Sequence, residues 1–221
     1  MKALKSVLEA VGNTPIVQLQ KVLPAPGSAT IFAKLEYMNP GGSIKDRMVK
    51  FLLEEMDSAG SLNERSVLVE NSSGNTGAAL SMAAAARGLR CIVTIPDKMS
   101  GEKIARMRAF GTEVVVAPTA VEADDPRSYY SMARDIAERT PDSIYPDQYN
   151  NPLNAQAHYH TTGPELWEQT EGDIDVLVCG MGTAEPLPVS GATSKKRTRR
   201  SRLLGRIRSA VFFMTTSTSE K

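Results

Sequence analysis

The sequence predicts an α/β fold built around a parallel, twisted sheet. Between residues 66 and 139, short runs rich in Val and Ile alternate with segments of helical periodicity at a regular interval. Strands separated by helices in this way form right-handed βαβ crossovers, and the helices cover both faces of the sheet. The glycine-containing loop at residues 72–77 follows one of these strands and opens a helix. Ligands of such sheets bind at the carboxyl ends of the strands, so this loop marks a candidate site.

The first part of the chain contains a helix with a clear apolar stripe. The expected elements are, in order, a short helix in residues 1–12, strands at 16–20 and 30–37, and a helix at 44–59. The last of these has apolar residues at helical spacing, which are Ile44, Met48, Phe51, Leu52 and Met56. Asp46 falls in its first turn and Gly60 follows its end, as is typical of helix termini.

The alternating region supplies the elements of the parallel sheet. We expect strands at 66–70, 90–95 and 113–117, and helices at 76–87, 102–110 and 126–139. Ser100 is expected to cap the helix at 102–110, and Gly111 to end it. Residues 143–154 are expected to be irregular, followed by helical material within 158–170 and an apolar strand at 175–179.

Composition indicates a soluble, globular protein. The 221 residues are 41% hydrophobic and 23% charged, and residues 1–10 contain no apolar run that would suggest a secretory signal, so we expect a cytoplasmic protein without a membrane segment. Cys91 and Cys179 lie in apolar, strand-like runs, which favours buried thiols over a disulfide. His158 and His160 form an HxH pair with no third ligand nearby, so no metal site is predicted.

The charge is distributed unevenly along the chain. Residues 184–221 carry nine Lys and Arg against two Glu, whereas the preceding 183 residues carry 17 against 23. The cluster at 195–202 is compatible with a nucleic-acid patch or a nuclear-import signal. We favour the alternative that residues 184–221 are a divergent, disordered tail read from out-of-register coding sequence, and we do not expect nucleic-acid binding.

Two motifs carry the candidate chemistry. In the first, NPGGSIKDR at residues 39–47, two glycines allow a tight turn and Ser43 is placed to cap the following helix. Lys45 then lies in the first helical turn, where the positive end of the helix favours the neutral, nucleophilic amine that a Schiff-base lysine requires. The second motif is SSGNTG at residues 72–77. A glycine-bearing turn that enters a helix is a ready anion site.

These motifs resemble those of the cystathionine β-synthase and cysteine synthase branch of the pyridoxal-phosphate-dependent enzymes. The resemblance implies the two-lobed fold of the tryptophan-synthase β subunit, with parallel twisted sheets, and pyridoxal 5′-phosphate as cofactor. It also implies that Lys45 forms the Schiff base and that Asn75 contacts the 3′ oxygen of the cofactor. Ser73, Asn75 and Thr76 would belong to the loop that holds the substrate carboxylate, and Gln148 would reach the same carboxylate.

The resemblance ends in a glycine loop. Gly182 and Thr183 match the start of the loop whose N–H groups cradle the cofactor phosphate in this family. The family pattern continues with two glycines and a threonine, but this sequence has Ala184, Glu185 and Pro186. We therefore expect an enzyme domain at 1–183, with a small lobe at about 40–147, an incomplete large lobe, and weak cofactor binding with little or no activity.

The chemistry implied by the resemblance is β-replacement on serine or an activated serine. Residues 96–103, 125–130 and 147–149 resemble the cystathionine β-synthase branch, in which serine and homocysteine give cystathionine. The alternatives are cysteine synthase, which uses O-acetylserine and sulfide, and a non-catalytic remnant or partner subunit. The expected partners are amino-acid and thiol substrates, together with a second copy of the chain, since intact relatives are homodimers.

Overall fold

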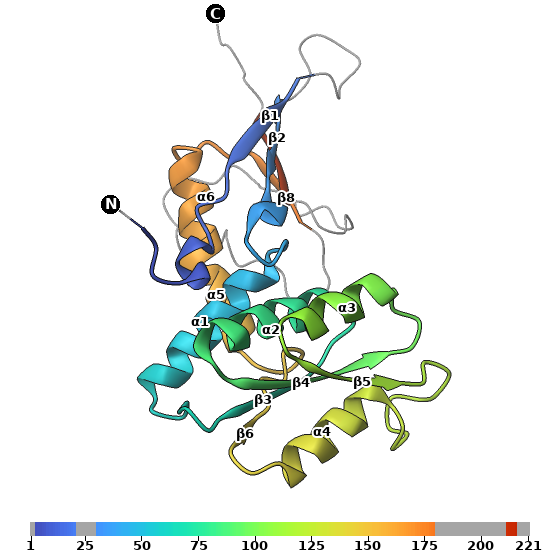
Figure 1. Cartoon of the computed structure of the whole chain (residues 1–221). Coiled ribbons are helices and arrows are strands. Elements are labelled where there is room, and N and C mark those ends of the chain that lie inside the picture. The colour runs from blue at the N-terminus through green and yellow to red at the C-terminus, as the bar shows by residue number, and fades with distance from the viewer. Residues whose placement is uncertain (1–2, 21–29, 180–210, 216–221) are drawn as a thin grey trace, which may run out of the picture.

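The computed structural model describes residues 3–20, 30–179 and 211–215. Its elements form two groups, seen one above the other in Figure 1. The lower group is a parallel sheet with helices on both faces, and the upper group is a second sheet flanked by a helix from residues 163–169. The fold is therefore α/β, as the sequence predicts.

The parallel sheet contains four strands in the order β5-β4-β3-β6. They are β3 (Val67–Asn71), β4 (Arg90–Pro96), β5 (Glu113–Ala117) and β6 (Ser143–Ile144), and every pairing between them is parallel. The first three agree with the predicted strands to within one residue at each end. The fourth falls in the segment expected to be irregular, because two residues are too few to leave a periodic signal.

Helices cover both faces of this sheet, as expected for βαβ units. They are α1 (Lys45–Ser58), α2 (Asn75–Arg87), α3 (Gly101–Ala109) and α4 (Tyr129–Arg139). In Figure 1 the first three lie above the sheet and α4 lies below it. Successive residues of β3 alternate between the two layers: Leu68 packs in the core with α1 and α2, whereas Val69 packs in the core that contains Ile136 of α4.

The second sheet is antiparallel at every described pairing, which differs from the expectation of parallel sheets in both lobes. Its order is β1 (Ile16–Leu19), β2 (Thr30–Lys34), β8 (Val211–Thr215) and β7 (Val176–Val178). Adjacent parallel strands need a crossover connection of about a dozen residues or more, and only residues 20–29 lie between the first two strands. Strand β8 belongs to the tail for which we expected disorder. Residues 184–210 and 216–221 of that tail lie outside the described residues.

The chain between the two sheets is more helical than the sequence suggests. Short 3₁₀ segments form at η1 (Val7–Ala10) and η2 (Glu36–Met38), so β2 ends three residues before the predicted boundary. Residues 153–169 form one helical stretch that consists of α5 (Leu153–Ala157), the π-helical turn η3 (His158–Thr162) and α6 (Gly163–Gln169).

Two local expectations are tested by the core and the caps. Cys91 and Cys179 are buried free thiols, which confirms the prediction for both. Ser100 occupies the N-cap position of α3, but its side chain makes no capping hydrogen bond, so that part of the prediction was wrong.

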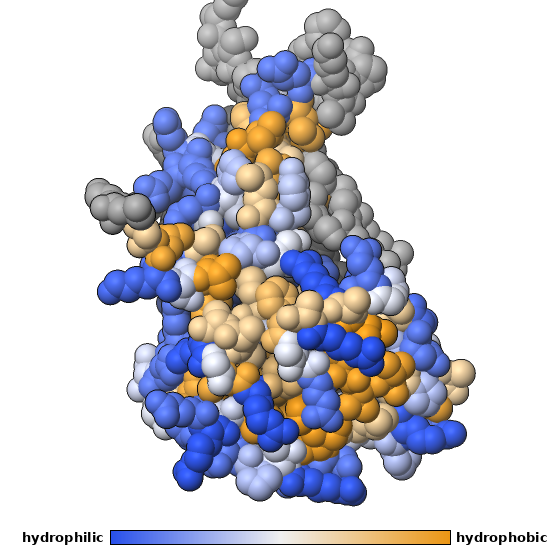
Figure 2. Space-filling view, viewed as in Figure 1, coloured by the Kyte–Doolittle hydropathy of each residue, from blue (hydrophilic) through white to orange (hydrophobic). Residues whose placement is uncertain are grey.

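None of the described helices is long and apolar enough to cross a membrane. Figure 2 shows apolar side chains gathered over α2 and α3, interrupted by charged ones.

Candidate functional site

The loop at residues 72–77 leaves the carboxyl end of β3 and opens α2. Its shape is set by Ser72, whose Oγ accepts hydrogen bonds from the N–H groups of Gly74 (3.1 Å) and Gly77 (2.8 Å). Gly74 has a φ of +151°, and a Cβ at this position would lie 2.8 Å from Nζ of Lys103. The loop thus needs glycine for its backbone conformation, and the side chain of Lys103 approaches it closely.

The structure brings Thr76 and Gln148 together from positions far apart in the sequence. The Thr76 hydroxyl donates a hydrogen bond of 2.5 Å to Oε1 of Gln148, and Nε2 of Gln148 donates to the carbonyl of Asn71 at 3.3 Å. Thr76 and Gln148 are both buried, with exposed fractions of 4% and 2%. These hydrogen bonds hold the buried amide of Gln148 in one orientation at the N-terminus of α2.

Ser73 and Asn75 lie on the open side of the same loop. Both are exposed, and Asn75 is the first residue of α2. Burial raises the pKa of Tyr149, while a side-chain hydrogen bond with Ser73 acts in the opposite direction, which places the tyrosine next to Gln148 against this loop. The four predicted carboxylate-binding residues therefore lie at one loop, with Thr76 and Gln148 buried and Ser73 and Asn75 exposed.

Lys45 is the first residue of α1 and is half-buried. Oγ of Ser43 accepts a hydrogen bond of 3.2 Å from its backbone N–H, so Ser43 satisfies one N–H group at this helix start, as the sequence indicates. The N–H of Gly41 donates to the carboxylate of Asp46 at 2.5 Å, and a Cβ on Gly41 would lie 2.2 Å from Oδ1 of Asp46. Only glycine fits this turn. Burial raises the pKa of Asp46 to about 6.

Helix α3 contacts both motif loops. The guanidinium of Arg106 donates a hydrogen bond of 2.8 Å to the carbonyl of Gly41, and Lys103, one turn earlier, approaches Gly74. The loop that leads to Lys45 and the loop that opens α2 are therefore held at the same end of the helical layer. Sequence reasoning did not single out either cation of α3.

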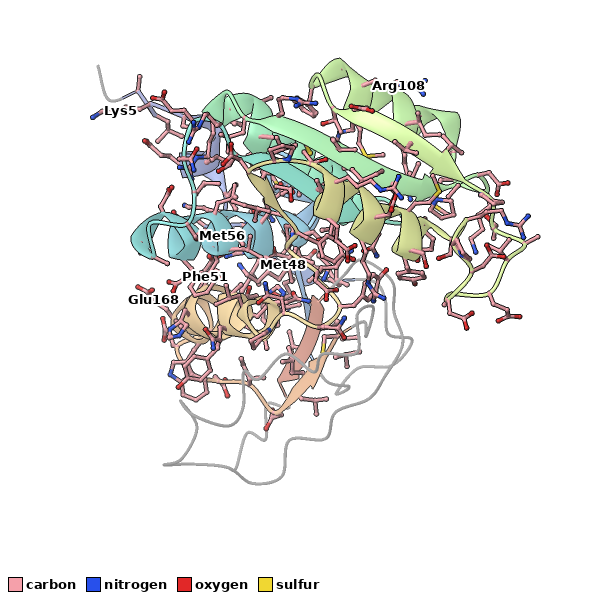
Figure 3. The ribbon with its side chains drawn as sticks, turned by 90° about the horizontal axis from the view of Figure 1, so that it is seen from below. Lys5, Met48, Phe51, Met56, Arg108 and Glu168 are labelled. Carbon is pink, nitrogen blue, oxygen red and sulfur yellow. The ribbon has the colours of Figure 1, made fainter. Side chains whose placement is uncertain are left out.

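His158 is a neighbour of Lys45 that sequence reasoning did not assign to the site. Burial lowers the pKa of His158 to about 4, and the positive charge of Lys45 is the next largest cause. Its Nδ1 lies 3.0 Å from Oγ1 of Thr162 within the π-helical turn, a structure that is frequent at functional sites. In Figure 3, Met48 and Phe51 of α1 face the helical stretch that carries His158, and His160 stacks on Phe51.

Buried charges tie the start of α1 to the second sheet. Arg47 donates to both oxygens of Glu36, at 2.7 and 2.9 Å, and to both oxygens of Glu165, at 2.7 and 2.8 Å. Lys34 of β2 adds a contact of 2.6 Å to Glu165. Glu165 is 118 residues from Arg47 and 131 residues from Lys34, so no local sequence pattern predicts these ion pairs. Each ion has an opposite partner, as buried charges require.

The described part of the site fits pyridoxal phosphate. The amine of half-buried Lys45 and the amide of exposed Asn75 begin two neighbouring helices, and glycines at 41 and 74 keep the backbone of both loops free of side chains. An amine that can form an imine and an amide that can bind a ring oxygen are the donor set that this group needs. Gly182 and Thr183 lie outside the described residues, so their part in a phosphate cradle stays a prediction.

Comparison with known proteins gives a family and several relatives. Residues 7–205 match the family described as "Pyridoxal-phosphate dependent enzyme". The cystathionine beta-synthase of Apis mellifera is 40% identical over 196 residues, which cover 88% of this chain and 39% of that protein. The protein of the same name from Saccharomyces cerevisiae is 42% identical over 185 residues, covering 80% of this chain and 36% of the relative. This chain thus spans less than two-fifths of the length of these curated relatives.

Solved structures extend the likeness to the fold. An O-acetylserine-dependent cystathionine beta-synthase from Helicobacter pylori superposes with a TM-score of 0.82 at 34% identity, covering 93% of this chain and 66% of that one. A hydrogen sulfide-producing enzyme from Fusobacterium nucleatum gives 0.74 at 33% identity, covering 83% and 58%.

Proposed function

The chain belongs to the family of pyridoxal-phosphate-dependent enzymes, and from this premise we propose that its site performs β-replacement on serine in the manner of a cystathionine β-synthase. The observation that carries the proposal is the buried hydrogen bond between Thr76 and Gln148 at the N-terminus of α2. It holds a hydroxyl and an amide, both neutral, beside a positive helix end, which suits an amino-acid carboxylate.

Lys45 has the central role in this proposal. Its Nζ would hold the cofactor and, when the substrate takes its place, would accept the proton from the substrate Cα. When bound, pyridoxal phosphate supplies the electron sink for that proton removal. Asn75 would bind the ring oxygen of the cofactor, and the half-buried setting of Lys45 limits the access of water.

The substrate carboxylate would bind across the loop at 72–77. Ser73 offers a hydroxyl donor, and Gln148 and Asn75 offer amide donors. Oε1 of Gln148 accepts the hydrogen bond from Thr76 and Nε2 donates one to the carbonyl of Asn71, so the second N–H of Nε2 is the donor that Gln148 would offer to the carboxylate. The predicted substrates are therefore an amino acid and a thiol, in sulfur amino-acid metabolism. A homodimeric assembly and a cytoplasmic location remain predictions.

The thiol acceptor separates two versions of this function. Relatives at 40–42% identity that are named cystathionine beta-synthase favour homocysteine. The runner-up is cysteine synthase, with O-acetylserine and sulfide, and the name of the Helicobacter pylori protein shows that one structural relative uses O-acetylserine. A third alternative is a non-catalytic chain, which the sequence Ala184-Glu185-Pro186 in the glycine loop favours.

One assay decides between these functions. The purified chain is saturated with pyridoxal phosphate and given serine with homocysteine, or O-acetylserine with sulfide, and the products are identified by mass spectrometry. Cystathionine that is absent with Lys45→Ala supports the proposal. Cysteine formed from the second pair alone favours the runner-up. No product from either pair, in a chain that is folded by circular dichroism, identifies a non-catalytic protein.

A further inference from the structure

Glu70 is a fully buried carboxylate at the end of an otherwise apolar strand. It is the fourth residue of β3, where it follows Val67, Leu68 and Val69, and its exposed fraction is 0%. Its Oε1 accepts a hydrogen bond of 3.0 Å from the N–H of Asn71, and its Oε2 accepts one of 3.3 Å from the N–H of Gln148. Burying an acidic side chain in such a strand costs free energy unless hydrogen bonds replace its contacts with water.

The contacts of Glu70 hold the backbone of Gln148 from one side. From the other side, Nδ2 of Asn154 donates a hydrogen bond of 3.1 Å to the carbonyl of Gln148. The side chain of Gln148 is fixed separately, by Thr76 and by the carbonyl of Asn71. Strand β3 therefore holds Gln148 at two points, since Glu70 binds its backbone N–H and the carbonyl of Asn71 binds its side chain.

We propose that Glu70 is a positioning residue: its carboxylate bridges the N–H of Asn71 on β3 and the N–H of Gln148, and so fixes the main chain of Gln148 where its side-chain amide meets Thr76 at the N-terminus of α2. This inference deepens the proposed function and rests on it, because that function assigns Gln148 and Thr76 to the substrate carboxylate. Glu70 itself does not touch the substrate. It acts through the geometry of the residue that does.

The chemistry of the contact explains why glutamate is needed. Two N–H donors converge on the two oxygens of one side chain. Glutamine has the same shape but offers one oxygen and one NH₂ group, which would face a backbone donor and leave it unpaired. Leaving a buried donor unpaired costs more than the bond itself is worth, so Glu70→Gln should release the main chain of Gln148.

The surroundings of Glu70 also give a signature in pH. Burial raises the pKa of Glu70 to about 8, and the negative charge of Asp147 acts in the same direction. The other titratable groups that face it are Tyr145 on the loop and Cys91 on β4, and Arg134 of α4 lies near Tyr145. Ionisation of Glu70 strengthens the hydrogen bond that it accepts from Gln148, since charge-assisted bonds are stronger than neutral ones.

The test follows the Gln148 amide by ¹⁵N NMR and hydrogen exchange in the full chain. In Glu70→Gln, exchange of the Gln148 amide should rise about tenfold at a pH above the pKa of Glu70, as expected for the loss of one hydrogen bond to a charged group, while the amide of Val93 in β4 stays protected. The matched control is Glu113→Gln, an exposed glutamate on β5, which should change neither amide. Unchanged exchange at Gln148, or an equal rise at both amides, overturns the proposal.

An NMR titration and a calorimetric titration test the same proposal independently of amide exchange. In the unmutated chain the Gln148 amide resonance should shift as Glu70 ionises, with an expected midpoint near pH 8. A Gln148 amide that follows no titration at any pH at which the chain is folded overturns the proposal, even if Glu70→Gln does not fold. Calorimetry with L-serine on the chain saturated with pyridoxal phosphate should show about tenfold weaker binding in Glu70→Gln, with unchanged cofactor affinity. If the unmutated chain binds no serine, the proposed function fails, and the exchange result still decides the role of Glu70.

Discussion

The guanidinium of Arg47 on α1 lies 2.7 Å from the carboxylate of Glu165 on α6, although 118 residues separate them. Arg47 follows Lys45 by two positions, so this ion pair fixes the first turn of the helix that carries the proposed Schiff-base lysine. Glu165 also binds Lys34 and accepts hydrogen bonds from the N–H groups of Asn13 and Thr14. The site and the second sheet are thus joined through one buried carboxylate.

Removing the charge of Glu165 should destabilise the whole chain. Glu165→Gln leaves two buried cations short of a partner, and breaking a buried pair in this way costs about 3 kcal/mol of unfolding free energy. The control is Asp135→Asn, which breaks the exposed pair between Asp135 and Arg139 and should cost less than about 1 kcal/mol. Urea denaturation of the three proteins measures both. Equal losses in the two variants would show that the buried network adds no stability.

Removing the hydroxyl of Thr76 should weaken serine binding more than cofactor binding. Thr76→Ala deletes the donor to Gln148, and one hydrogen bond in a site for a charged group is worth roughly a tenfold to hundredfold change in affinity. Thr76→Ser keeps the hydroxyl and is the matched control, which should bind serine nearly as well as the unmutated chain. Calorimetric titrations with serine and with pyridoxal phosphate provide the comparison. Parallel losses for both ligands in Thr76→Ala would contradict the role of this loop.

Asp46 should make stability depend on pH between about 4 and 6. Burial raises its pKa from 3.8 to about 6, so the folded chain holds this proton more tightly than the unfolded chain. The contribution is fully present below pH 4 and is lost as the pH rises through 6, by about 3 kcal/mol. Asp46→Asn lacks this contribution. The unfolding free energy of the unmutated chain, relative to that of Asp46→Asn, should therefore decrease as the pH rises across that range. A pH-independent difference would argue against a buried, protonated Asp46.

Restoring the family pattern in the glycine loop should strengthen cofactor binding. Replacing Ala184, Glu185 and Pro186 with Gly, Gly and Thr returns backbone N–H donors and removes a negative charge near a dianion. Two recovered charge-assisted hydrogen bonds correspond to about two to four decades in affinity for pyridoxal phosphate. Glu220→Gln, which removes a tail charge without altering the loop, is the control. Equal affinities in all three chains would show that residues 184–186 do not contact the phosphate.

Local patterns were sufficient for the longer elements. Helix α1 was predicted from apolar residues at helical spacing, and strands β3, β4 and β5 from short runs rich in Val and Ile that alternate with helical segments. The antiparallel second sheet was not predicted, because strand direction depends on which distant segments meet. Strand β6 was missed for the same reason: its two residues are defined only by their pairing with Val67 and Leu68.

The site shows the same division between local and distant information. The loops that carry Lys45 and Thr76 are continuous motifs, so the resemblance located them, and it also indicated Gln148, which the structure places against Thr76. Glu70, His158 and the network of Arg47 were not foreseen. Each of these residues is buried and interacts with residues that are distant in the sequence. In the sequence, each is a single polar residue in a helix or strand with no motif around it.

The most direct test of this account is the covalent attachment of the cofactor. The full chain is incubated with excess pyridoxal phosphate, reduced with sodium borohydride to fix any imine, digested and examined by mass spectrometry. We predict that the reduced cofactor is attached to Lys45, and that Lys45→Ala loses this label while the exposed Lys98→Ala keeps it. Labelling spread over surface lysines and unaffected by Lys45→Ala would contradict the assignment of this site.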